Sequence, residues 1–167
     1  FKSFSDTSKC NLNISATAIP NLSIVSNMSA MFQSCSTLNS PTNINLWNTS
    51  NVTTMGNLFF DATSFNQPLG NWNTGSVTNM QQMFGSASAF NQPIGNWNTG
   101  NVTNMQALFA NANSFNQPIG NWNTSNVTNM VSMFRGASSF NQPIGSWNTG
   151  NVTDMEKMFS YTSSFNQ

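Results

Sequence analysis

The pattern of apolar and polar positions along the chain repeats every 25 residues. Tryptophan, valine, methionine and two phenylalanines recur at this spacing in one common register. Self-similarity at a fixed period of this length is the signature of a repeat array. The tryptophans are Trp47, Trp72, Trp97, Trp122 and Trp147. The register extends back to Val25, with two extra residues between Pro41 and Trp47.

Each repeat divides into two halves with different local signals. Residues 102–112 have apolar side chains at i, i+3, i+6, i+7 and i+10, which favours a short helix or a run of helical turns. Residues 119–124 follow a proline and predict a short strand. Ile119 and Trp122 are three apart and cannot both point inward from a regular strand, so a bend at Gly120 is expected. Because one coil cannot bury its apolar side chains alone, we expect a repeat solenoid of right-handed coils, each with one short parallel strand and a short helix or helical turn.

The ends of the chain differ from the array. Residues 1–23 lose the pattern and are expected to form an N-terminal cap, because terminal repeats are usually atypical. Residues 24–167 form the tandem repeats, and we expect the array to continue beyond residue 167. Cys10 and Cys35 are one coil length apart, which favours a disulfide between cap and first coil in an extracellular setting. The alternative is two buried free thiols.

The composition argues against several classes of function. Only 5% of residues are charged, the formal net charge is zero, and there is no histidine. Nucleic-acid binding depends on clustered Lys and Arg, and the four basic residues do not cluster. No apolar run approaches the roughly 20 residues of a membrane-spanning helix. General acid–base catalysis uses paired carboxylates or a histidine, so we expect no enzyme, no cofactor and no metal site.

Two columns of side chains are candidate binding surfaces. The tryptophan column is expected to pack in the core, and the alternative is an exposed aromatic track that stacks on sugar rings. The Asn–Thr pairs beside it are expected to hydrogen-bond between coils. The alternatives are a recognition surface or a flat ice-binding face. This candidate binding ladder comprises Asn48, Thr49, Asn73, Thr74, Asn98, Thr99, Asn123, Thr124, Asn148 and Thr149. The methionine column most simply fills the core, with copper ligation as the alternative.

Two further sets of positions bear on function. N-x-S/T sequons mark possible N-glycosylation sites. They begin at Asn13, Asn21, Asn27, Asn48, Asn51, Asn101, Asn123, Asn126 and Asn151. Few positions vary between coils, and binding specificity usually depends on those that do. The varying pairs are 56–57, 81–82, 106–107, 131–132 and 156–157, and the pairs that start at 60, 85, 110, 135 and 160.

The repeat unit resembles a known family. Its pattern W-N-T-G-N-V-T-N-M-x-x-M-F-x-x-A-S-S-F-N-Q-P-I is similar to the 25-residue bacterial surface-protein repeat of mycoplasma lipoproteins. The segment 28–38 also resembles a BspA-type leucine-rich repeat, with Cys35 on the consensus cysteine and Leu38 on the consensus leucine. The resemblance covers about residues 25–167. It implies a secreted or surface-displayed, leucine-rich-repeat-like solenoid used for adhesion or protein binding.

Together these features predict an extracellular or cell-surface protein with a structural or adhesive role. It would be a rigid spacer or filament component that binds other proteins or copies of itself, with no nucleic-acid partner and no membrane insertion. One alternative is a module that recognises a glycan or protein through an exposed Trp or Asn–Thr ladder. A second alternative is an ice-binding solenoid.

Overall fold

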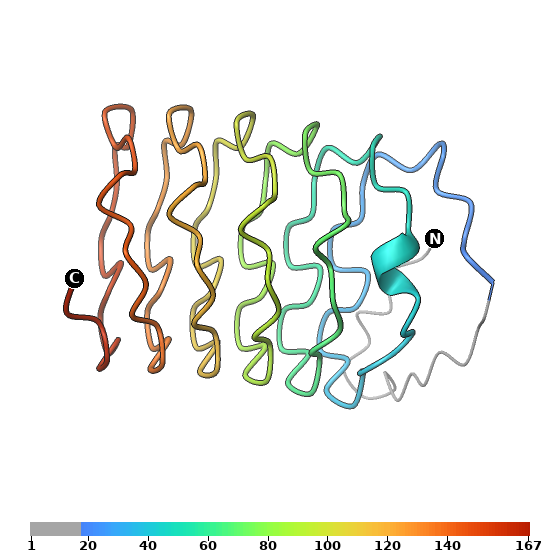
Figure 1. Ribbon diagram of the computed structural model, residues 1–167, viewed down its shortest axis with the longest axis horizontal. Helices are drawn as coiled ribbons and strands as arrows, with labels where there is room; N and C mark the ends of the chain where they lie inside the picture. The colour runs from blue at the N-terminus through green and yellow to red at the C-terminus, as the bar shows by residue number, and fades with distance from the viewer. Residues whose placement is uncertain (1–17) are drawn as a thin grey trace.

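The computed structural model describes residues 18–167, which wind into flattened coils that lie side by side along one axis (Figure 1). Isolated parallel β-bridges join one residue of each coil to its counterpart in the next coil. The bridged residues are Asn27, Thr54, Asn79, Asn104, Asn129 and Asp154. This row defines six coils and follows the sequence period. The handedness of the coils and their relation to leucine-rich repeats stay predictions.

One short helix occurs within the described residues. It is the 3-10 helix η1 (Ile44–Leu46), which Figure 1 shows between the first and second coils. It falls in the two-residue insertion between Pro41 and Trp47. A single 3-10 turn accommodates the extra residues without moving Trp47 out of register, since the Trp47 N–H still bonds back to the Ile44 carbonyl at 3.1 Å.

Of the two alternatives that their apolar stripe predicts, a short helix or a run of helical turns, residues 102–112 do not form the helix. They form consecutive turns in which the N–H of Leu108 donates to the carbonyl of Met105 at 3.2 Å. Ala107 and Asn111 have φ of 51° and 56°, in the left-handed region that a right-handed helix excludes. Every coil has two such residues four apart. The segment is therefore a run of consecutive turns with two left-handed residues four positions apart.

These turns direct every second peptide group toward the neighbouring coil. In one coil pair, four N–H groups donate to carbonyls of the next coil at 2.7 to 3.0 Å. The donor and acceptor pairs are Met55 and Asn79, Asn57 and Gln81, Phe59 and Met83, and Asp61 and Gly85. The four bonds point the same way along the axis. The neighbouring coil thus pairs the backbone groups that a helix would pair internally.

The other half of the coil does not form the strand predicted at 119–124. The Trp122 N–H donates to the Ile119 carbonyl at 3.1 Å, which closes a turn around Gly120. This turn points Ile119 and Trp122 to the same side, and both are buried. The expected bend is present, while the parallel bridges lie in the opposite half of the coil, at Asn104 and its counterparts.

The core is a set of aromatic and aliphatic columns along the stack. Phe59 and Phe65 stack within one coil with ring centroids 3.9 Å apart, and Phe59 stacks on Phe84 of the next coil at 5.7 Å. The same contacts recur in later coils. Each aromatic pair contributes about 0.5–1.5 kcal/mol beyond the burial of its rings. Because the columns cross every coil boundary, the described residues share one core.

Candidate functional site: the variable face

The tryptophan column belongs to the core. Trp97 is 4% exposed, and its Nε1–H donates to the Leu69 carbonyl of the preceding coil at 3.0 Å. Trp72, Trp122 and Trp147 make the same bond to the coil before them. The alternative of an exposed aromatic track is therefore wrong, because burial with a satisfied N–H leaves no ring face for a sugar.

The Asn–Thr ladder is divided between core and surface. Thr49, Thr74, Thr99 and Thr124 are buried, and each hydroxyl donates to the backbone carbonyl of an asparagine in the next coil at 2.9 to 3.0 Å. The paired asparagines are exposed. Their Oδ1 atoms accept the N–H two residues later within the same coil, so they cap turns and form no amide stack between coils. The four buried threonines cannot serve as a binding or ice-facing surface, whereas Thr149 in the last coil is exposed.

Other predicted positions are placed as follows. Met55, Met80, Met105 and Met130 are fully buried in the core, while Met155 is 41% exposed. Cys35 is buried and disulfide-bonded, but Cys10 lies outside the described residues, so the Cys10–Cys35 pairing stays a prediction. Asn13 also lies outside them. The other sequon asparagines, Asn21, Asn27, Asn48, Asn51, Asn101, Asn123, Asn126 and Asn151, are exposed.

One side of the stack is nearly identical in every coil, and we call it the uniform face. It consists of Asn66, Gln67, Pro68, Gly70 and Asn71 with their counterparts in the other coils. The Oδ1 of each leading asparagine accepts the N–H and the Gln Nε2–H of the next coil at 2.9 to 3.0 Å. These bonds explain why the asparagine and glutamine of the uniform face are the same in successive coils. Replacing either of them would leave its hydrogen-bond partner unpaired.

A shallow groove of about 580 Å³ follows the uniform face. Prolines and asparagines line it over a floor of glycines: Gly70, Asn71, Pro93, Gly95, Asn96, Pro118, Gly120, Asn121 and Pro143. The glycines have a structural cause. A Cβ on Gly95 would lie 2.4 Å from the Pro118 carbonyl oxygen, so a side chain there would push the next coil away. The groove is uncharged and repeats without change.

A second side of the stack carries the varying pairs and is here called the variable face. It consists of residues 54, 56–57 and 60–61 with their counterparts in the other coils. Main-chain bonds between coils pair the backbone here, so side-chain identity is free to change. All five charged residues of the described chain lie on this face: Asp61, Arg135, Asp154, Glu156 and Lys157.

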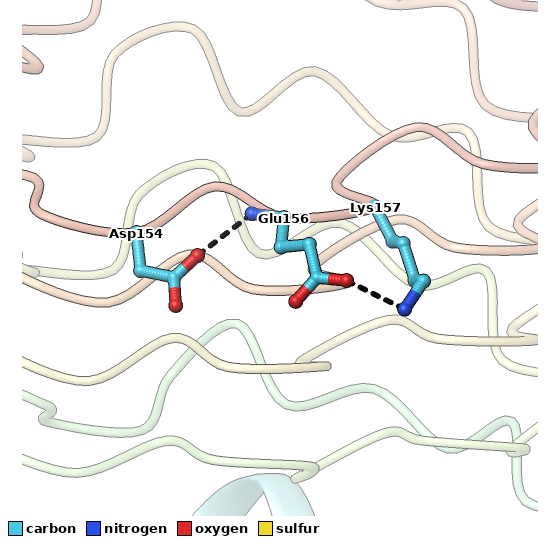
Figure 2. Close-up of polar contacts among 3 residues, drawn as sticks. All are labelled: Asp154, Glu156 and Lys157. Atoms are coloured by element: carbon cyan, nitrogen blue, oxygen red, sulfur yellow. Dashed lines mark hydrogen bonds and ion pairs between the residues drawn. The ribbon is translucent and has the colours of Figure 1, made fainter.

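At the acidic end of the variable face, a carboxylate takes the place of an asparagine amide, and the turn keeps its hydrogen bond (Figure 2). Asp154 stands where four earlier coils have asparagine. Its Oδ1 accepts the N–H of Glu156 at 2.9 Å, as those asparagines do for their own coils. Lys157 pairs with Glu156 at 2.6 Å. Both side chains are more than half exposed, so the pair contributes at most about 1 kcal/mol. These charges therefore modify the surface and not the fold.

A hollow of about 340 Å³ opens on the variable face. Its lining comprises Phe60, Gln82, Ser86, Gln106, Ala107, Ala110, Asn111, Ser132 and Arg135. Every one of these residues belongs to a pair that varies between coils. None of the Asn–Thr ladder residues lines this hollow or the groove on the uniform face.

Comparison with known proteins identifies the repeat. A family model described as "Mycoplasma protein of unknown function, DUF285" matches residues 1–106 and 92–167, two overlapping segments that span the chain. The chain belongs to this family. No curated protein and no solved structure matches this DUF285 chain. The relation to BspA-type repeats stays a prediction, and the family description states no function.

Sequence reasoning misses the hollow although it finds the positions that form it. The varying pairs are visible in the DUF285 repeats, but the lining of the hollow comes from four successive coils. How the side chains of different coils line up along the axis is not visible within one repeat. The described residues contain no group of three His, Cys, Asp or Glu that could hold a metal ion. Within residues 18–167 no helix has the length and apolarity to cross a membrane.

Proposed function

We propose that this DUF285 chain is a non-catalytic binding module that presents a partner-specific surface on a rigid repeat scaffold. The proposal rests on the observation that several features lie on the same face of the stack. The positions with the largest differences between coils, the charged side chains and the hollow of about 340 Å³ share one face, while the other face is nearly constant. A spacer without a partner would have no reason to place charge on one face only.

The chemistry of the variable face favours a protein as the partner. Amides, hydroxyls, the two aromatic rings of Phe60 and Tyr161 and charges of both signs suit the mixed surface of a protein. Nucleic acid would need several clustered cations, and Arg135 and Lys157 are the only two basic residues within the described chain. The stacked coils hold the contact residues in place before binding, which lowers the entropy cost of association.

We place this binding function at the cell surface or outside the cell. The disulfide at Cys35 supports an oxidising environment. A low density of charge over the remaining surface suits an adhesive or spacer element. The structural role predicted from the sequence and the binding role are compatible, because the same stack that spaces two points apart also carries the variable face.

The test compares two face-blocking variants with the same added charge. Gln106→Lys with Asn111→Lys blocks the variable face, and Asn96→Lys with Asn121→Lys blocks the uniform face. Proteins captured from the source cells would be identified, purified and titrated against the parent chain and both variants. We expect a partner whose affinity falls by about tenfold or more for the variable-face variant and stays nearly constant for the other. A partner that is lost only with the uniform-face variant, or no partner that distinguishes the faces, would contradict the proposal.

A further inference from the structure

The hollow on the variable face has different chemistry at its two ends. It extends along the axis from the second coil, which supplies Phe60, to the fifth coil, which supplies Arg135. Glutamine, asparagine and serine side chains line the part between. An aromatic ring thus marks one end and a cation marks the other.

Two alanines in the fourth coil create the space. Ala107 stands where other coils have Ala30, Asn57, Gln82, Ser132 or Lys157. Ala110 stands where they have Gln33, Phe60, Gly85, Arg135 or Ser160. Substituting either alanine with its larger counterpart would add side-chain atoms to the hollow. The cavity therefore follows from local sequence variation, and the uniform part of the repeat does not produce it.

The ring of Phe60 is held in place at the N-terminal end. A Cβ on Gly85 would lie 2.9 Å from the Phe60 Cδ2, so the ring covers this glycine of the next coil. Phe60 remains half-buried and keeps part of its surface in solvent. A fixed, partly exposed ring provides an apolar contact for a ligand at little cost in side-chain entropy.

Arg135 at the C-terminal end is a cation without a salt bridge among residues 18–167. The salt bridge there joins Lys157 to Glu156 instead. The Arg135 guanidinium lies 5.7 Å from the centroid of the Tyr161 ring in the next coil, a cation–π contact that orients the side chain and leaves its donors free for an anion. Arg135 is exposed, so a ligand can reach it.

We propose that the hollow binds an extended segment of the partner protein, with an apolar side chain against Phe60 and a carboxylate at Arg135. This assignment rests on the function proposed above. Three coil spacings separate the two ends, about 14 Å, which four or five extended residues span. Asp61, next to Phe60 in sequence, repels an acidic group at that end and so fixes the direction of the segment.

The single positive charge matches a carboxylate better than a phosphate. A phosphate group has nearly two negative charges, and its recognition in proteins relies on clusters of arginine. Here Arg135 is the one arginine of the sequence, and the next coil adds the carboxylates of Asp154 and Glu156. A dianion would meet insufficient positive charge at this site.

The test uses short peptides and the resonance of the single arginine. Acetylated and amidated Leu-Ser-Gly-Ser-Glu, its Gln analogue, its phosphoserine analogue and the reversed sequences would be titrated into the ¹⁵N-labelled chain. The Nε–Hε signal of Arg135 reports binding. We expect saturable shifts with one of the two Glu peptides and affinity about two- to fivefold weaker for its Gln analogue. In Arg135→Gln, which lacks the Nε–Hε reporter, binding is followed by the backbone amide signals of the hollow, and the difference between the Glu and Gln peptides should disappear. Ala110→Phe should weaken the binding of all the peptides. Lys157→Gln should change neither the affinities nor the difference between the Glu and Gln peptides.

Several results would overturn the assignment. Equal affinity of the Glu and Gln peptides, unchanged selectivity in Arg135→Gln, tighter binding of the phosphoserine peptide, or no shift with any peptide would each contradict it. If a partner still depends on the variable face in the capture experiment, only the ligand assignment fails. If no partner depends on that face, the proposed function fails as well.

Discussion

At the scale of single residues, buried polar groups are retained where the next coil satisfies them. Thr99 has its methyl group in the core, while its hydroxyl donates to the Asn123 carbonyl at 3.0 Å. A carbonyl that loses contact with water and has no hydrogen-bond partner is costly, so the Thr99 hydroxyl stabilises the next coil as well as its own. Thr103, four residues later, makes a comparable bond to the Thr78 carbonyl at 3.3 Å but is exposed to water.

This contrast predicts unequal effects of one substitution at two sites. Thr99→Val should lower the free energy of unfolding by about 1–2 kcal/mol, because the part-buried Asn123 carbonyl loses its hydrogen-bond donor. Thr103→Val should lower it by less than about 0.5 kcal/mol, because water replaces the hydroxyl. Urea unfolding followed by tryptophan fluorescence measures both. Equal losses would show that the buried hydrogen bond is not what stabilises the Thr99 site.

At the scale of elements, the turn segment replaces the helix in every coil. Its two left-handed residues per coil are serine, alanine, asparagine, aspartate, glutamine, lysine or tyrosine, and only Gly136 is a glycine. Left-handed backbone costs about 1–2 kcal/mol for a residue with a Cβ. The hydrogen bonds to the neighbouring coil offset this cost, so the conformation depends on stacking.

A matched pair of valine substitutions tests the left-handed backbone. Ser86 has φ of 57°, whereas Ser88 lies outside the left-handed region and has Thr63, already β-branched, as its counterpart. Ser86→Val should reduce the free energy of unfolding by about 1–2 kcal/mol, since a β-branched residue strongly disfavours positive φ. Ser88→Val should have a much smaller effect. Chemical denaturation of both variants provides the comparison, and a larger loss for Ser88→Val would argue against the turn geometry.

The sequence predicts which side chains of this segment point inward but not the conformation of its backbone. Val102, Met105, Leu108, Phe109 and Ala112 are all fully buried, as their spacing indicates. Turns closed by i→i−3 bonds give nearly the same apolar spacing as a helix, so periodicity cannot separate the two. The left-handed residues give no signal because they are not glycines. Pairing with a second coil, which decides the conformation, is not visible within one repeat.

The candidate site, too, could be predicted only in part from the sequence. The buried threonines and exposed asparagines of the predicted ladder are neighbours in sequence, and hydropathy alone does not assign Thr99 inward and Asn98 outward. The varying pairs can be identified in the sequence, yet their assembly into one hollow requires the stacking of four successive coils. Size differences between coils, such as Ala110 against Phe60, are the signal from which a cavity could have been predicted.

At the scale of the whole molecule, each coil contacts only its neighbours, so the array should tolerate loss of a complete repeat. Deleting residues 92–116 joins Asn91 to Gln117 and keeps the register. We expect a folded, less stable protein, because fewer coil interfaces remain. Deleting residues 92–103 breaks the register and should prevent folding. Circular dichroism and size-exclusion chromatography show whether each deletion variant folds. If both variants fold, or neither does, the stack does not depend on the 25-residue register.

The division into a uniform face and a variable face is the central claim, and site-specific photo-crosslinking tests it most directly. A photoreactive amino acid would replace Asn111 on the variable face in one protein and Asn96 on the uniform face in another, each expressed in the source cells. We predict a discrete crosslinked protein from position 111 and none from position 96. Crosslinking from position 96 with none from position 111 would contradict the account.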